Sequence, residues 1–67
     1  MKENKKYQIN HSRKGNFSLL VNKINGEWIT GIIIKGTASA IMDYNVREKG
    51  EEITVRECLI TSYKEII

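Results

Sequence analysis

The chain has 67 residues, a formal net charge of +3, one cysteine and one histidine. This length allows one small domain, which buries only about 60% of the surface that its unfolded chain exposes. Cys58 alone cannot form an intrachain disulfide, His11 alone gives no metal framework, and the aliphatic run Ile32–Ile34 is too short to span a membrane.

The first ten residues lack the apolar periodicity of a strand or a helix. Residues 1–14 carry five basic side chains and one acidic side chain, whereas residues 15–67 carry six basic and seven acidic ones. We therefore expect a flexible basic arm over residues 1–10, followed by a single domain over residues 11–67. Such an arm either contacts an anion such as nucleic acid or serves only as a solubilising tail, with His11 solvated beside it.

Two segments rich in β-branched and aromatic residues, Asn16–Ile24 and Glu27–Lys35, flank the dipeptide Asn25-Gly26. This pattern predicts a β-hairpin, because a type I′ turn needs positive φ at both central positions and Asn followed by Gly meets that need. The second segment is apolar on both faces, so we expect it to need cover beyond the domain core. Gly31 in its middle predicts a bulge or a sharp bend.

Thr37–Tyr44 is expected to form a third strand, followed by an exposed polar loop at residues 45–50. A fourth strand starts at Glu51 or Glu52. Two interpretations of the C-terminal segment stay open: a strand with a bulge near Arg56-Glu57, or a short helix with a capping-box pattern. Its β-branched residues favour the strand.

Together these elements predict an all-β fold, in which four or five short antiparallel strands curl into a small barrel of the SH3-like or OB-like kind. A core this small commonly gains stability by self-association. The single cysteine and the lack of a secretory signal are typical of a cytoplasmic protein.

Catalysis is poorly supported by the sequence. Cys58 lies in a β-rich apolar segment, which predicts a small buried hydrophobic side chain, and no third group is evident that would orient a Cys–His pair. The sequence has neither a phosphate-binding glycine-rich loop nor the spacing of zinc ligands. We therefore expect no enzyme, no metal site and no cofactor.

Binding of an anionic ligand is better supported, because arginine presents a planar fork that matches phosphate and aromatic rings stack on bases. The candidate ligand- or partner-binding residues are Arg13, Lys14, Trp28, Tyr44, Arg47 and Arg56. A competing interpretation places Trp28 in the core. In the same interpretation, Arg47 and Arg56 form surface ion pairs with nearby acidic residues, namely Glu48, Glu51, Glu52 or Glu57.

Surplus apolar surface on a small domain usually marks an interaction site. Both faces of the segment Trp28–Ile34 are apolar, so we expect a homo-oligomer or a protein partner, with Ile29 and Ile33 as interface residues. No membrane partner is expected.

Four runs of the sequence, Arg13–Phe17, Glu27–Ile34, Lys35–Asn45 and Gly50–Arg56, resemble a group of short hypothetical proteins of phages and prophages in Gram-positive bacteria. The resemblance covers most of the chain between the first and last of these runs. It implies a small SH3-like barrel and a phage-borne accessory protein in the host cytoplasm. It brings no catalytic residues to this chain.

The sequence and the resemblance together predict a non-enzymatic protein that acts by stoichiometric binding. It would inhibit a host process or defence system by capturing a host protein or a nucleotide-like anionic ligand. The alternative is a small nucleic-acid-binding regulator, whose affinity would fall steeply as the salt concentration rises.

Overall fold

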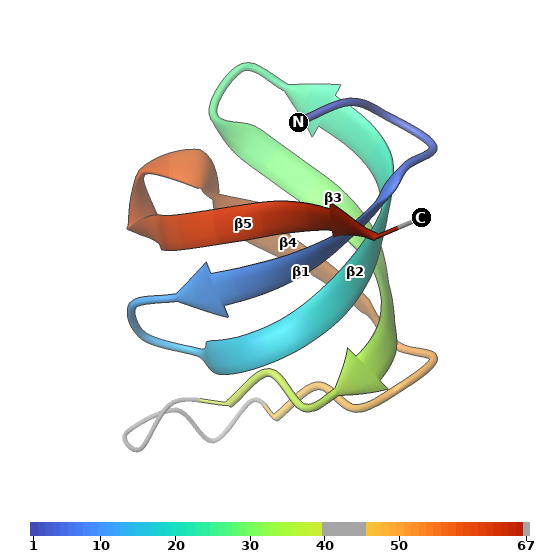
Figure 1. Ribbon diagram of the computed structural model, residues 1–67, viewed down its shortest axis with the longest axis vertical. Helices are drawn as coiled ribbons and strands as arrows, with labels where there is room; N and C mark the ends of the chain where they lie inside the picture. Colours follow the sequence, from blue (N-terminus) through green and yellow to red (C-terminus); the bar gives the residue numbers. More distant parts are fainter. Residues whose placement is uncertain (40–45, 67) are drawn as a thin grey trace.

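The computed structural model of the chain describes residues 1–39 and 46–66. Over these residues the chain forms, in order, β1 (Lys6–His11), β2 (Gly15–Asn25), β3 (Trp28–Gly36), β4 (Glu52–Arg56), the 3-10 helix η1 (Glu57–Leu59) and β5 (Ile60–Ile66). The strands make one antiparallel sheet in the order β4-β3-β2-β1-β5 (Figure 1), which confirms the predicted all-β fold. None of the described segments is a helix long and apolar enough to cross a membrane.

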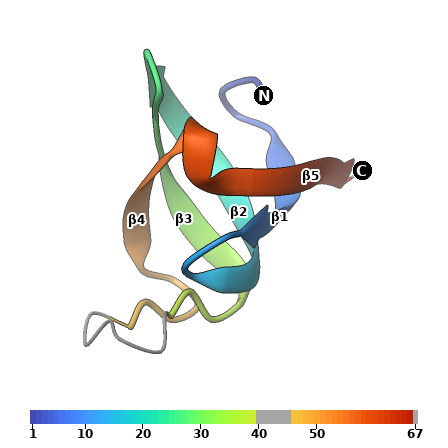
Figure 2. The same ribbon diagram turned by 90° about the vertical axis from the view of Figure 1, so that its left-hand side faces the viewer.

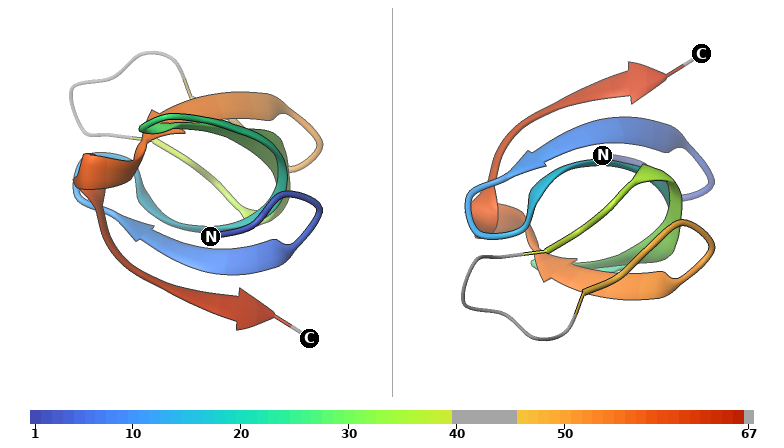
Figure 3. Two further views of the ribbon diagram at one scale, coloured as in Figure 1. Left: turned by 90° about the horizontal axis from the view of Figure 1, so that it is seen from above. Right: turned by 90° about the horizontal axis from the view of Figure 1, so that it is seen from below.

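The sheet curls around one interior, as the two end-on views of Figure 3 show. The 3-10 helix η1 carries the chain from β4, at one edge of the sheet, to β5 at the other edge (Figure 2). Closure into a barrel would require β4 and β5 to pair, and the strand pairs formed by the described residues do not include this one. The predicted barrel closure therefore stays a prediction.

The core lies on the inner face of the curled sheet, because side chains alternate between the two faces of each strand. Its buried apolar residues are Tyr7, Ile9, Phe17, Leu19, Val21, Ile29, Ile33, Ala38, Ile53 and Val55. Every strand except β5 contributes to this set. The side chains of β5 are mostly exposed, including those of Tyr63 and Ile66.

The predicted flexible arm over residues 1–10 is wrong. Residues 6–10 belong to β1, which lies between β2 and β5, and the inward side chains of Tyr7 and Ile9 are fully buried. The residues before β1 also contact the sheet: the Asn4 N–H donates to the Val21 carbonyl at 2.7 Å, and the Lys2 N–H donates to the Tyr7 hydroxyl at 2.8 Å. The N-terminal segment is therefore part of the folded domain.

The predicted hairpin is confirmed, but its turn is displaced by one residue. Asn25 pairs with Trp28, so Gly26 and Glu27 are the two central residues of the turn. Gly26 has φ of +62°. Glu27 does not have positive φ, because Asn4 is the one non-glycine residue in the described ranges that does. Positive φ at the first central position alone is the pattern of a type II′ turn, so the predicted type I′ turn is wrong.

The register between β2 and β3 shifts at two points. Asn22 is an extra residue on β2, next to the pair Val21–Gly31, and Ile34 is an extra residue on β3. A Cβ atom on Gly31 would lie only 2.4 Å from the Leu20 carbonyl oxygen, so the two backbones approach more closely than any side chain allows. The irregularity predicted at Gly31 is confirmed at this place, although the extra residue belongs to the opposite strand.

The predicted third strand is only partly within the described residues. Of residues 37–39, Ala38 alone forms a bridge, with Arg47, and residues 40–44 lie outside the described ranges. The Ala38 side chain is 1% exposed, in keeping with the close approach that its small size predicts.

At the C-terminus the strand interpretation is confirmed. The bulge expected near Arg56-Glu57 is replaced by η1, a single 3-10 turn that separates β4 from β5. Cys58 lies in this turn and is exposed, so its predicted burial is wrong.

We predict that Gly31→Ala lowers the free energy of unfolding by about 1–3 kcal/mol, because the added methyl group must push β2 and β3 apart. Urea denaturation followed by circular dichroism measures this change. Lys23→Ala is the control, because Lys23 is exposed on β2 next to the same irregularity and its truncation adds no atom between the two strands, so stability should change by no more than about 0.5 kcal/mol. Equal unfolding midpoints for Gly31→Ala and the wild type would contradict the account of the close approach.

Candidate functional site

Two of the predicted ligand-binding residues, Trp28 and Arg56, lie directly opposite each other on β3 and β4. The guanidinium carbon of Arg56 is 5.4 Å from the centroid of the Trp28 ring, within the range of a cation–π interaction. Trp28 is 45% exposed, so the interpretation that it belongs to the core is wrong. An exposed indole beside a guanidinium can stack on a planar ligand and attract its negative charge.

The ion pair of Arg56 differs from the predicted ones. Its Nη2 atom donates to the Oε1 atom of Glu27, a residue of the β2–β3 turn, at 2.8 Å, and both side chains are about half exposed. An exposed pair of this kind contributes little to stability, because water and salt screen it. A phosphate could therefore compete with Glu27 for the Arg56 guanidinium.

Other predicted ligand-binding residues lie beyond the opposite end of β3. The Lys14 carbonyl accepts a hydrogen bond from the Ser39 N–H at 2.9 Å, and the neighbouring residue Ala38 exchanges two backbone hydrogen bonds of 2.9 Å with Arg47. Arg13 is exposed in the turn between β1 and β2. Tyr44 lies outside the described residues. The predicted site residues are thus divided between the two ends of β3.

Ile29 and Ile33 are not interface residues. Each is 1% exposed and packs within the core. The sequence-based prediction assigned the face of Ile29 and Ile33 to the interface, whereas the register places Ile29, Gly31 and Ile33 on the inner face. The residues of β3 that face outward before the bulge are Trp28, Thr30 and Ile32.

The outward side chains of the sheet form a cationic surface, which we call the outer face. Pairing and alternation place the basic residues Lys6, Lys23, Lys35, Arg56 and Lys64 on it, together with the acidic residue Glu52. Glu27, in the adjoining turn, forms an ion pair with Arg56, so the four lysines supply the excess of positive charge. Four of these five basic residues were missed by the sequence analysis. Lys6 and Lys64 could have been found from the alternation of side chains along β1 and β5. Lys23 and Lys35 could not, because they reach this face only through the two bulges.

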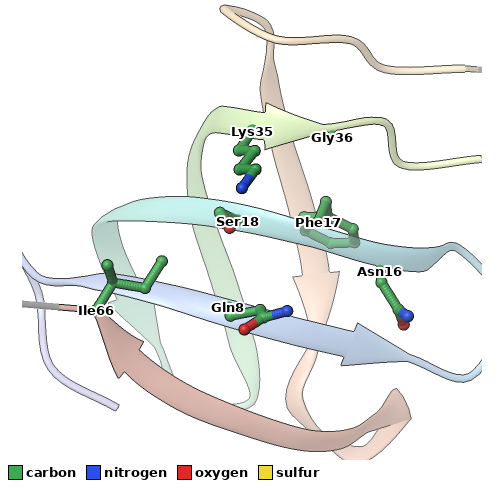
Figure 4. A pocket seen from close by; sticks show the side chains of 7 residues that line it. All are labelled: Gln8, Asn16, Phe17, Ser18, Lys35, Gly36 and Ile66. Carbon is green, nitrogen blue, oxygen red and sulfur yellow. The ribbon is translucent and has the colours of Figure 1, made fainter.

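The outer face contains an open hollow of about 390 Å³ between β1, β2 and β3. Ser18 lies at its floor, and it pairs with Gln8 on one side and with Lys35 on the other. Figure 4 shows the Lys35 side chain reaching across above Ser18, with Asn16 and Ile66 at the margins of the hollow. Amide, hydroxyl and ammonium groups thus converge on one depression.

His11 is buried rather than solvated, which corrects the sequence-based expectation. Its Nδ1 atom accepts hydrogen bonds of 3.1 Å from the backbone N–H groups of Arg13 and Lys14, so the ring holds the turn between β1 and β2. An accepting Nδ1 leaves the proton of the neutral ring on Nε2, which is buried and has no hydrogen-bond partner in the described parts of the chain. Burial lowers the pKa of the His11 imidazole below 6.5, and the positive charges of Lys14 and Arg13 lower it further.

No family model, curated protein or solved structure matches this chain. The resemblance to phage proteins stays a prediction. Within residues 1–39 and 46–66, no three side chains of His, Cys, Asp or Glu are grouped as metal ligands.

We predict that the free energy of unfolding falls as the pH drops below about 6.5, because the unfolded chain then protonates His11 before the folded protein does. Above this pH the ring is neutral in both states and its stabilisation is complete. The free energy of unfolding stops falling once the pH is below the lowered pKa of His11 in the folded protein, because the ring is then protonated in both states. Urea denaturation at about pH 7.5, 6.5 and 5.5 measures the trend.

Two variants separate titration from hydrogen bonding at this position. In His11→Asn the side-chain oxygen takes the place of Nδ1 and does not titrate, so the loss of stability between about pH 6.5 and 5.5 should shrink. In His11→Gln the amide lies further out, and stability should fall by about 1 kcal/mol per lost hydrogen bond at every pH. An unchanged pH trend in His11→Asn would contradict the role of His11.

Proposed function

We propose that this protein is a non-enzymatic binding domain for single-stranded nucleic acid, which it contacts with the outer face of its sheet. The observation that carries the proposal is the exposed Trp28, placed beside Arg56 on the same face as four lysines. Basic side chains attract phosphates, and an exposed aromatic ring gives an unpaired base a surface on which to stack.

Single strands suit this surface better than duplexes do. In a duplex both faces of each base are stacked on neighbouring base pairs, so Trp28 could reach a base only by disrupting them. A single strand offers its bases at no such cost, and base–aromatic stacking contributes about 1–3 kcal/mol per base. The N-terminal segment contributes through Lys6 on the outer face of β1 rather than as a mobile arm.

A second candidate function is capture of a protein partner or of a second copy, as the phage-type accessory role predicts. It is favoured by β5, an edge strand with two exposed apolar side chains, Tyr63 and Ile66. The edge of a sheet can pair with a strand from another chain. Inhibition of a host protein or defence system and a cytoplasmic location both remain part of this second proposal.

We predict that Trp28→Leu weakens binding of a fluorescein-labelled oligothymidine by about 5- to 150-fold, because a stacking surface worth about 1–3 kcal/mol is lost. Fluorescence anisotropy measures the dissociation constant. Tyr63→Leu is the matched control: Tyr63 has similar exposure, at 49%, but its position opposite Ile9 puts it on the inner side of the sheet. Equal weakening by both substitutions would contradict the assignment of the outer face.

We also predict that the affinity falls steeply with salt and that Lys6→Gln makes this dependence shallower by about 0.7 in a plot of log K against log salt, since one phosphate contact is lost. Lys49→Gln, in the exposed turn before β4, should leave the slope unchanged. Deleting residues 1–10 is not a useful test, because it would remove most of β1. An affinity independent of salt would exclude phosphate contacts as the basis of binding.

A further inference from the structure

The hollow on the outer face is built around an unusual position, Ser18. This residue faces away from the core, yet it is only 6% exposed. Its short side chain pairs with two long ones, Gln8 on β1 and Lys35 on β3. The result is a depression in the sheet surface, with polar groups of these residues beside apolar atoms that include those of Phe17 and Gly36.

The groups around this depression suit the edge of a nucleobase. The Gln8 and Asn16 amides each provide donors and an acceptor, and the Ser18 hydroxyl provides both as well. Unpaired bases are read by hydrogen bonds to their edges, while their faces rest on apolar or aromatic side chains. Ile66, which is 38% exposed at the margin of the hollow, offers such a surface, and Lys35 offers a charge for the adjoining phosphate.

We propose that this hollow is a base-reading pocket, in which Gln8 and Ser18 select one type of base from a bound single strand. The inference rests on the proposed function, since it assigns a specificity site on the same face. A volume of about 390 Å³ lies within the range of small-ligand pockets, so it has room for a base and part of its sugar.

The pocket is a second contact point, separate from Trp28. Trp28 and Lys35 are seven positions apart on β3, which sets an upper limit of roughly 23 Å on their separation, because the strand curls and contains the extra residue Ile34. One strand of nucleic acid could therefore stack on Trp28 at one end of β3 and place another base in the pocket at the other end. Trp28 stacking tolerates any base, whereas hydrogen bonds from Gln8 and Ser18 do not.

The test compares the affinities of fluorescein-labelled homopolymers of deoxyadenosine, deoxycytidine and deoxythymidine by fluorescence anisotropy at one salt concentration. For the wild type we expect the best and worst homopolymers to differ about tenfold or more, as good hydrogen-bond readout of a base allows. In Gln8→Leu and Ser18→Ala this ratio should fall to about twofold, with weak binding of all three retained. The same series in RNA shows whether the strand is read as DNA or as RNA.

Thr30→Val is the matched control, because it removes a hydroxyl from the same face outside the pocket, where Thr30 contacts Thr54 at 2.9 Å. It should keep the wild-type base preference, and thermal melts monitored by circular dichroism check that each variant is folded. Equal affinity of the wild type for all three homopolymers, or a preference that survives both pocket substitutions, would overturn the base-reading pocket alone. Failure to bind any oligonucleotide would refute the proposed function and the pocket with it.

Discussion

The fold depends on the close approach of β2 and β3 at Gly31. With a Cβ atom excluded by the Leu20 carbonyl at 2.4 Å, only glycine allows the two backbones to lie this close together. Beside this point Asn22 is inserted in β2, so the alternation of the strand changes phase. Val21 before the insertion and Ile24 after it can then both pack on the core, although they are three residues apart. A regular strand could not achieve this, because residues three apart point to opposite faces.

The same irregularities create the surface that we propose to be functional. The insertion at Asn22 turns Lys23 outward, and the insertion at Ile34 does the same for Lys35. The core consequently takes the aliphatic side chains, and the outer face collects charge, amides and the exposed Trp28. Packing and the proposed function are therefore linked through the backbone of one hairpin. A change that straightened β2 or β3 would be expected to affect both.

Much of the sheet could be predicted from the sequence, because its signals are local. Asn25-Gly26 between two β-rich segments predicted the hairpin, and Gly31 marked the irregular place within it. β1 was missed because its outward positions are Lys6, Gln8 and Asn10, so that only Tyr7 and Ile9 indicate a strand. His11 was predicted to be solvated because its backbone partners, the N–H groups of the next turn, cannot be recognised from residue types. Ile29 and Ile33 were assigned to an interface because a sequence apolar on both faces does not show which face is the core.

The outer face is the central claim, and it is tested most directly by titrating the isotope-labelled protein with a short oligothymidine and following the amide and indole resonances by NMR. We predict that the indole N–H of Trp28 and the amides of outward residues such as Lys6, Ser18 and Lys35 shift together in one saturable process. The inner-face residues of β5, such as Tyr63, should be unaffected. Shifts confined to β5, or no shifts at concentrations well above the micromolar range, would contradict the account.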